Sequence, residues 1–254
     1  MSSRAEEKAK AREARLAAER AATQADARKK RLVTLGGILA AAAVIVVVAI
    51  LVSQSGTEDA PTEEERAALF DGIPQSGTKL GSDTAPVVVQ EFADLQCPFC
   101  AQFSETGLPP IVSDYVKPGD VQMELRLMTF LGEDSVTGGR VAQAAAAQNK
   151  LWDFAEAFYA DQGEENSGYV TDDFLKDIAS KSGVDLAKAQ AGAEDAAVTE
   201  ALDENAKDFE AGGLTGTPGF LVGPRGGKMK AVANPDDLPD AIADALKQAG
   251  QSGT

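Results

Sequence analysis

Cys97 and Cys100 are the only two cysteines in the chain, and they lie close together in the segment FADLQCPFCAQF. Two sulfurs at positions i and i+3 can approach bonding distance in the first turn of a helix. If Cys97 lies at the helix N-terminus, unpaired N–H groups and the helix dipole favour its thiolate. Pro98 suits this first turn because its missing N–H has no partner to lose there. The spacing therefore indicates a redox-active pair, in which Cys97 attacks and Cys100, one turn deeper, resolves.

Two structural interpretations of the cysteine pair remain as alternatives. A structural disulfide would close too small a loop to restrict the unfolded chain much. A zinc site or an iron–sulfur cluster would need further ligands, and the chain has no histidine and no other cysteine. We therefore expect no metal and no cofactor. The absence of histidine also removes the usual Ser/His and Cys/His hydrolases.

The first 31 residues differ in charge from the rest of the chain. They carry ten Lys/Arg and five Asp/Glu, whereas the whole chain has a net charge of −16. The body is therefore strongly acidic, which argues against nucleic acid as its partner because phosphates would be repelled. Residues 32–52 follow the basic N-terminal segment and form an uncharged apolar run, LVTLGGILAAAAVIVVVAILV. As a helix this run would be about 30 Å long, enough to span the hydrocarbon core of a bilayer.

The charges that flank residues 32–52 predict an orientation. Arg28–Arg31 precede the run and Glu58 and Asp59 follow it, so the positive-inside rule places residues 1–31 in the cytoplasm as a basic tail. The alternative is a cleaved secretory signal, although the apolar run and the basic region before it are both unusually long for one. Under either interpretation we expect residues 53–254 to lie outside the cytoplasm. If the apolar segment is retained, the protein crosses the cell membrane once. Disulfides can persist outside the cytoplasm.

The elements that would position the cysteine pair follow a polar linker and lead-in, residues 53–79. VVVQEFAD, residues 87–94, is rich in β-branched residues and predicts a buried strand directly before the CPFC segment. A helix should then run to an interruption at Gly107–Pro110, followed by a second helical stretch. Residues 121–130 alternate as a second strand. This strand–helix–strand order predicts parallel pairing with a right-handed crossover.

The remainder of the chain predicts a helical block followed by a hairpin and a last helix. Residues 135–211 have helical periodicity with several breaks, and their aromatic residues fit an apolar helical face. Two short strands, about residues 219–222 and 228–232, should flank a hairpin loop at Gly223–Gly227. The last helix should begin at or after Asn234. The order β–α–β, helices, β–β–α predicts an α/β fold with a mixed sheet.

Three segments in this order resemble one family: EFADLQCPFC, KLWDFAEAFYADQ and GTPGFLV. They are similar to DsbA-like thiol–disulfide oxidoreductases of the thioredoxin superfamily, particularly the membrane-anchored bacterial branch, and the match covers about Leu80 to Ala249. The resemblance implies a thioredoxin-like domain at 80–254, with an all-helical subdomain inserted at about 133–211. One transmembrane helix would precede this domain.

The resemblance also implies roles for the site residues. Cys97 would be the nucleophile and Cys100 the resolving cysteine, with Pro98 and Phe99 completing the motif. Pro218 would be a cis-proline facing the disulfide, and Thr217 would offer backbone hydrogen bonds to an extended substrate peptide. A cis X–Pro bond costs little compared with other cis peptides. The alternative for Pro218 is an ordinary loop proline ahead of a strand.

Glu91 is a third candidate for catalysis, six residues before Cys97 in a mostly apolar strand. Alternation places it on one face with Val87, Val89 and Ala93, which fits an inward position. The superfamily often has a buried carboxylate here, which could relay a proton to or from Cys100. A solvated strand glutamate is the alternative. We expect Asp94 to be a turn or rim residue.

The expected function is disulfide formation in exported proteins by a membrane-tethered enzyme. Its partners would be cysteine-containing exported proteins and a membrane redox partner that recycles the active-site cysteines. Phe99 stands where many DsbA proteins have histidine, so we expect a less oxidising centre than theirs. Reduction or isomerisation, for instance in cytochrome maturation, is one alternative. A redox-inert peptide-binding or chaperone module is the other, and it should retain its function in a Cys97→Ser variant.

Overall fold

The computed structural model describes Thr62, Arg66 and residues 68–252. These residues belong to one compact unit, Pro61–Thr254. The predicted basic tail, the predicted transmembrane segment and the first part of the predicted linker, within residues 1–61, lie outside the described residues. In the part of the chain that is described, no helix has both the length and the apolarity needed to cross a membrane.

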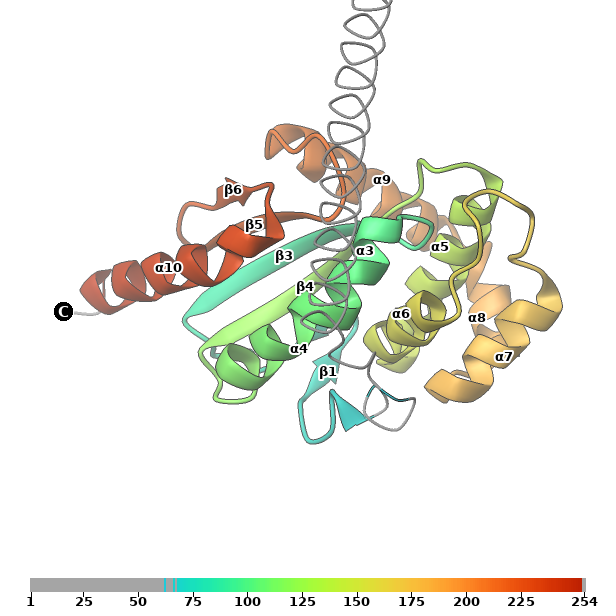
Figure 1. Ribbon diagram of the computed structural model, residues 1–254, viewed down its shortest axis with the longest axis horizontal. Coiled ribbons are helices and arrows are strands. Elements are labelled where there is room, and N and C mark those ends of the chain that lie inside the picture. Colours follow the sequence, from blue (N-terminus) through green and yellow to red (C-terminus); the bar gives the residue numbers. More distant parts are fainter. Residues whose placement is uncertain (1–61, 63–65, 67, 253–254) are drawn as a thin grey trace, which may run out of the picture. The chain divides into compact units, whose positions relative to one another are not determined.

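A mixed sheet forms the centre of this unit, in the order β1-β2-β4-β3-β5-β6 (Figure 1). The two central strands, β3 and β4, are parallel and pair along their whole length, whereas every other neighbouring pair is antiparallel. The predicted βαβ unit and the mixed sheet are thereby confirmed. The strands are β1 (Gln75–Ser76), β2 (Lys79–Leu80), β3 (Val87–Asp94), β4 (Val121–Met128), β5 (Gly219–Pro224) and β6 (Lys230–Val232).

The sheet differs from the prediction at its outer strands. β1 and β2 extend it into the predicted lead-in, and two residues are too few for an alternation pattern to reveal a strand. β5 continues through Gly223 and Pro224, which lie opposite Val88 and Val87 of β3. The predicted hairpin loop at Gly223–Gly227 was therefore misplaced, because pairing with the central strand holds its first two residues in the sheet.

Apolar side chains cover both faces of the sheet. On one face, Val87 and Val89 belong to the main core with Ile111 of α4 (Leu108–Ile111) and Ile242 of α10 (Leu238–Ser252). On the other face, Phe92 packs edge-on against Phe209 of α9 (Ala196–Ala211), with 5.8 Å between ring centroids. A strand that is covered on both faces favours apolar residues, which explains the valines and Phe92 of β3, whereas its buried Glu91 and Asp94 need another reason.

The segment after the CPFC motif is helical without the predicted interruption. It comprises α3 (Pro98–Gln102), a π-helical turn (Phe103–Gly107), α4, and a second π-helical turn (Val112–Val116). Pro109 lies at the start of α4, immediately after the first wide turn. Its missing N–H is tolerated there, as at the start of any helix, so the proline pair does not end the helical path.

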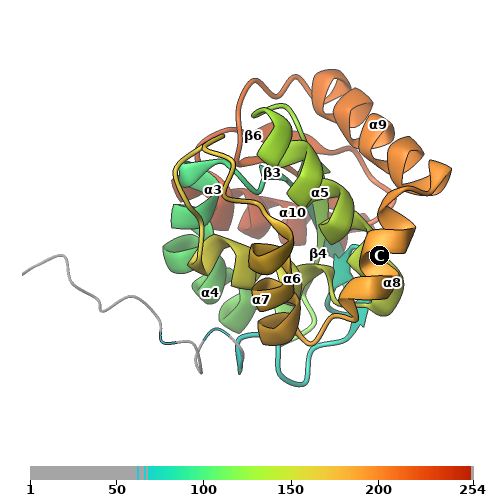
Figure 2. The ribbon, with the colours of Figure 1, turned by 90° about the vertical axis from the view of Figure 1, so that its right-hand side faces the viewer.

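The helical insertion lies between β4 and β5, as predicted. It is gathered beside the sheet in Figure 1, and Figure 2 views it from its outer side. In α6 (Leu151–Ala160), the aromatic residues Trp152, Phe154 and Phe158 are fully or almost fully buried in the same core as the sheet. The helices of the insertion are α5 (Glu133–Ala145), a short 3₁₀ turn (Ala146–Gln148), α6 (Leu151–Ala160), α7 (Asp172–Ser182), α8 (Leu186–Ala193) and α9 (Ala196–Ala211). Outside the insertion, a second 3₁₀ turn (Pro235–Asp237) precedes α10.

Candidate active site

Cys97 lies at the junction between the central strand and α3, where it is the N-cap residue of the helix. Its backbone is extended (φ −75°, ψ 118°), and its carbonyl oxygen accepts hydrogen bonds from the N–H groups of Cys100 and Ala101, both at 3.1 Å. Pro98 follows as the first helical residue. The Cys97 sulfur therefore faces the unpaired N–H groups of a helix N-terminus, as the sequence predicted.

The surroundings of Cys97 stabilise its thiolate. Hydrogen bonding with the Cys100 thiol is the largest influence that lowers the Cys97 pKa, to about 6, and it outweighs the opposing effect of burial. The Thr217 side chain and the backbone N–H groups of Phe99 and Cys100 lower it further. At pH 7 such a group is about 90% ionised. Cys97 is therefore a nucleophile and a good leaving group at neutral pH.

Cys100 has the opposite character. It is fully buried, and burial raises the pKa of its thiol well above the usual value, with the neighbouring Cys97 and Glu91 acting in the same direction. The two cysteines are unbonded thiols in this structure. Cys100 therefore keeps its proton at neutral pH, and it must lose this proton before it can attack a mixed disulfide.

The Thr217–Pro218 peptide bond is cis, as the resemblance implies. When protonated, the Cys97 thiol donates to the Thr217 carbonyl oxygen across 3.2 Å, so the loop before β5 lies directly against the active-site turn. A groove of about 530 Å³ runs between this loop and α3, and Phe99 on its wall is 67% exposed. The groove is lined by Phe99, Gln102, Phe103, Thr106, Gly107, Thr215, Gly216, Thr217, Pro218, Ala233, Asn234, Pro235 and Asp236.

Glu91 is inside the protein and not on its surface. It lies in β3 between Leu125 of β4 and Phe220 of β5, and only 3% of it is exposed. Burial raises its pKa to about 8, and the Glu156 carboxyl adds to the rise. Its Oε2 atom has no hydrogen-bond partner. The structure thus excludes the solvated alternative and places an acid that is mostly protonated at neutral pH near the Cys100 thiol.

Glu156 is a second buried carboxyl that the sequence reasoning missed. It projects from α6, is 6% exposed, and its Oε1 accepts a hydrogen bond of 2.7 Å from the Ser104 hydroxyl. Burial raises its pKa to about 7, although Ser104 and the Arg66 charge oppose the rise. One signal was available: Glu156 stands in LWDFAEAFYA, a helix that is apolar nearly all round and leaves a charged residue little exposed surface.

Asp94 was expected to be a turn or rim residue; it is fully buried, so the rim position was wrong, whereas the turn contact is present. One carboxylate oxygen accepts from the Gln96 N–H at 2.9 Å, which is the turn contact that a strand-end aspartate predicts. The other oxygen accepts from the N–H groups of Phe130 and Leu131 and, at 2.6 Å, from the Ser135 hydroxyl. Asp94 therefore connects the active-site turn to the first helix of the insertion.

The insertion also holds the active-site turn through neutral side chains that the sequence did not single out. The Gln162 side-chain amide donates to the carbonyl oxygens of Leu95 at 2.7 Å and Cys97 at 3.2 Å. Gln96, which is 1% exposed, donates to the Tyr169 hydroxyl and accepts from the Asn166 N–H. These contacts fix the backbone on which Cys97 stands.

No metal centre is formed by the residues that the structure describes. Among them, no group of three or more Cys, Asp or Glu side chains is placed to hold an ion. The chemistry available at this site is that of two thiols with widely separated pKa values, a cis-proline loop beside them and an acid beneath them.

The sequence model of the family described as Thioredoxin matches residues 75–244, which span the sheet, the insertion and the first seven residues of the last helix. The chain belongs to the thioredoxin family, and its fold is shared with solved DsbA-like proteins.

Individual proteins show the same likeness. A probable disulfide bond formation protein D from Bacillus cereus is 36% identical over 101 residues, which are 39% of this chain and 47% of that protein. The oxidised crystal structure of BdbD from Bacillus subtilis covers 69% of this chain and 97% of its own, at 23% identity and a TM-score of 0.59. A thioredoxin-like oxidoreductase from Silicibacter pomeroyi covers 71% and 96%, at 27% identity and a TM-score of 0.54. The chain spans about half the length of the curated disulfide-forming relatives that it matches.

Proposed function

We propose that this protein forms disulfides in exported proteins, as a membrane-tethered enzyme with its catalytic domain outside the cytoplasm. The observation that carries the proposal is the contrast between the two thiols beside the cis-proline. The pKa of Cys97 is lowered to about 6, whereas that of the buried Cys100 is raised well above its usual value. The names of the Bacillus relatives, disulfide bond formation proteins, support the oxidative direction.

The proposed exchange proceeds in two balanced steps. A client thiolate attacks the Cys97 sulfur of the Cys97–Cys100 disulfide, which forms a mixed disulfide, and Cys100 leaves and takes up a proton. A second client thiolate then attacks the client sulfur of the mixed disulfide, and Cys97 leaves as a thiolate. The client is oxidised by two electrons and the enzyme pair is reduced. A membrane redox partner would restore the disulfide by accepting these electrons.

The groove beside Cys97 suits an extended client segment. Thr217 lies at its inner edge, where backbone groups next to the cis bond are available to a peptide strand, and the exposed Phe99 provides an apolar contact. The groove has no charged side chain among its lining residues except Asp236. We therefore expect selection of an unfolded, apolar segment around the client cysteine and little dependence on its charge.

Cysteine replacement tests this function. The oxidised protein is mixed with a reduced, unfolded client that has two cysteines, and the loss of client thiols is followed. Cys97→Ser and Cys100→Ser should both abolish oxidation, because neither variant can form the Cys97–Cys100 disulfide. Mixed instead with the oxidised client, Cys100→Ser should trap a mixed disulfide, because Cys97 attacks the client disulfide, one client thiolate leaves and no resolving thiol remains in the enzyme. Ala101→Ser, in the same helix, is the matched control and should retain the wild-type rate. If the Cys97→Ser variant oxidised the client at the wild-type rate, the protein would not be a dithiol oxidase.

The proposed location rests on the sequence of residues 28–59. The apolar run 32–52 has four basic residues before it and acidic residues after it. Protease added to intact cells from which the wall has been removed should degrade the domain at 80–254 and spare the basic tail. Protection of the domain until the cells are lysed would refute the extracytoplasmic location.

A further inference from the structure

Glu91 and Glu156 form a buried pair of acids without a cation between them. They come from β3 and α6, and both are nearly inaccessible to solvent. Neither takes part in an ion pair within the described part of the chain. Buried carboxyl groups normally have a charged partner, because an isolated buried charge is costly. An arrangement of this kind indicates groups that hold and exchange protons.

The pair forms a chain of interactions that begins at the active site. Glu91, Glu156 and Cys100 are all buried, and each acid acts on its neighbour through its charge: Glu91 raises the pKa of Cys100, and Glu156 raises the pKa of Glu91. The unpartnered Oε2 of Glu91 leaves that carboxyl free to give or take a proton. Ser104, one helical turn after Cys100, binds Glu156 through its hydroxyl and so holds the outer carboxyl against the active-site helix.

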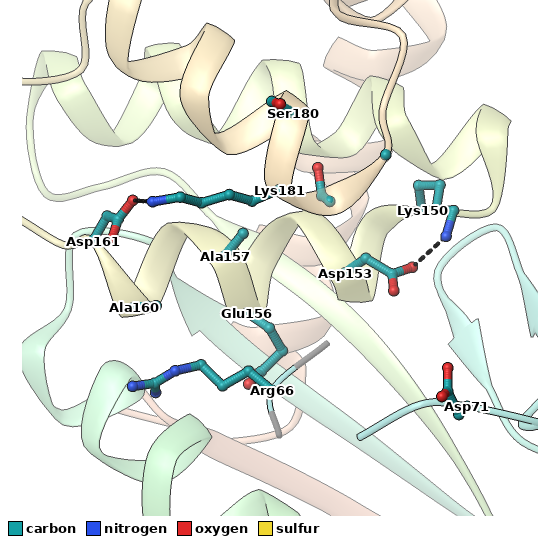
Figure 3. Close-up of a pocket in the computed structure, with 12 residues that line it drawn as sticks. Arg66, Asp71, Lys150, Asp153, Glu156, Ala157, Ala160, Asp161, Ser180 and Lys181 are labelled. Carbon is teal, nitrogen blue, oxygen red and sulfur yellow. Dashed lines mark hydrogen bonds and ion pairs between the residues drawn. The ribbon is translucent and has the colours of Figure 1, made fainter. Parts of the chain in front are cut away.

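Glu156 also lines a cavity of about 520 Å³, together with Arg66 and residues of α6 and α7. Figure 3 shows its side chain projecting from α6 on the side where Arg66 lies. In the same cavity wall, Lys150 pairs with Asp153 at 3.3 Å and Lys181 pairs with Asp161. The wall is polar and open enough to admit water, so the outer carboxyl has a route to solvent.

This cavity is separate from the groove beside Cys97. No residue that lines one lines the other. A client segment in the groove would cover Phe99 and the cis-proline loop on either side of Cys97, and it would leave the second cavity open. Protons could therefore be exchanged with solvent while the mixed disulfide is covered.

We infer that Glu156 is a positioning residue in a proton route that runs from the Cys100 thiol through Glu91 and Glu156 to the cavity near Arg66. This inference rests on the proposed function. When Cys100 leaves the disulfide as a thiolate, the Glu91 carboxyl gives it a proton, and Glu156 returns a proton to Glu91 from water in the cavity. In the reverse direction, when Cys100 attacks a mixed disulfide, its proton leaves by the same groups.

The charged groups around Glu156 hold its pKa near neutral pH, where the Glu91–Glu156 pair can exchange protons. Burial and Asp153 raise the pKa of Glu156, whereas Ser104 and Arg66 lower it, with a result of about 7. The pKa of Glu91 is about 8. The buried Tyr159, whose own pKa is raised well above its usual value, stays neutral beside both acids. The pair titrates as a coupled system across pH 7–8, so it holds at least one transferable proton there.

Glu156→Gln tests the route because it removes the titration and keeps a side chain that can bond to Ser104. The reduction of the Cys97–Cys100 disulfide by dithiothreitol is measured by stopped flow across pH 5–9. We expect a rate at pH 7 about tenfold below that of the wild type, and a pH inflection from Glu91 that moves to lower pH because a like charge is lost. Asp71→Asn, an exposed carboxyl in the same cavity wall, is the control and should match the wild type.

A second readout keeps the test decisive. The infrared carboxyl band of Glu91, identified as the band missing in Glu91→Gln, should titrate at lower pH in Glu156→Gln than in the wild type. A wild-type rate, inflection and band in Glu156→Gln would overturn the proton route and leave the oxidoreductase proposal intact. A wild-type disulfide that dithiothreitol cannot reduce would instead overturn the proposed function itself.

Discussion

Replacing Glu91 by glutamine should change how the stability of the reduced protein depends on pH. The pKa of Glu91 is raised from 4.5 to about 8, chiefly by burial. A carboxyl whose pKa is higher in the folded state contributes stability that is fully present below pH 4.5 and is lost as the pH rises towards 8. Glu91→Gln has the same shape but cannot ionise, so it should escape this loss.

The expected size follows from the two pKa values. A rise from 4.5 to about 8, at about 1.36 kcal/mol per pKa unit, amounts to about 5 kcal/mol once the group is ionised in both states. About 3–4 kcal/mol of this accrues between pH 5 and pH 8. The free energy of unfolding of Glu91→Gln should therefore gain about 3–4 kcal/mol relative to the wild type over this interval. Titrating groups that do not interact with Glu91 contribute equally to both proteins and cancel in the difference, whereas the coupled Glu156 does not.

Urea unfolding of the reduced proteins at pH 5 and pH 8 measures the effect. Glu200→Gln, a change at an exposed glutamate of α9, is the matched control, and its difference from the wild type should be nearly the same at both pH values. A Glu91→Gln difference that does not change with pH would mean that Glu91 ionises as easily as a surface carboxyl. The account of a buried acid beneath Cys100 would then be wrong.

Three further substitutions test the active-site turn. Phe99→His should lower the pKa of Cys97 and raise the redox potential by up to about 30 mV, because a positive charge would favour the thiolate. An unchanged redox potential at equilibrium with glutathione would contradict this effect of residue 99. Thr217→Val removes the side-chain hydroxyl that helps to lower the Cys97 pKa. It should raise that pKa by about one unit in a thiolate absorbance titration, and an unshifted curve would exclude a contribution from the hydroxyl. Asp94→Ala leaves buried hydrogen-bond donors without an acceptor. It should reduce the free energy of unfolding, measured by urea denaturation, by about 3–5 kcal/mol. A loss below about 1 kcal/mol would refute the structural role of Asp94.

The sequence predicted the parts of the fold that depend on local patterns. β3 has the predicted bounds, and the helices of the insertion span residues 133–211, because β-branched runs and helical periodicity are properties of neighbouring residues. The positions of Cys97 at a helix start and of the cis-proline were also predicted, the second through the family resemblance alone.

The rest depended on contacts between distant segments. An aspartate after a strand predicts a turn, but only the docking of residues 130–135 shows that Asp94 is buried. Glu156 lies near the site because α6 packs against the active-site helix, a contact that the local sequence pattern of α6 does not predict. Pro109 suggested a break, and the π-helical turn before it could not be read from composition.

The redox potential of the Cys97–Cys100 pair, measured at equilibrium against glutathione, tests the central claim most directly. A Cys97 pKa of about 6 lies between the values of about 7 for thioredoxin and about 3.5 for DsbA. The more the thiolate is stabilised, the more oxidising the disulfide becomes, so the account predicts a potential between about −270 and about −120 mV. A potential at or below that of thioredoxin would contradict disulfide formation as the function of this pair.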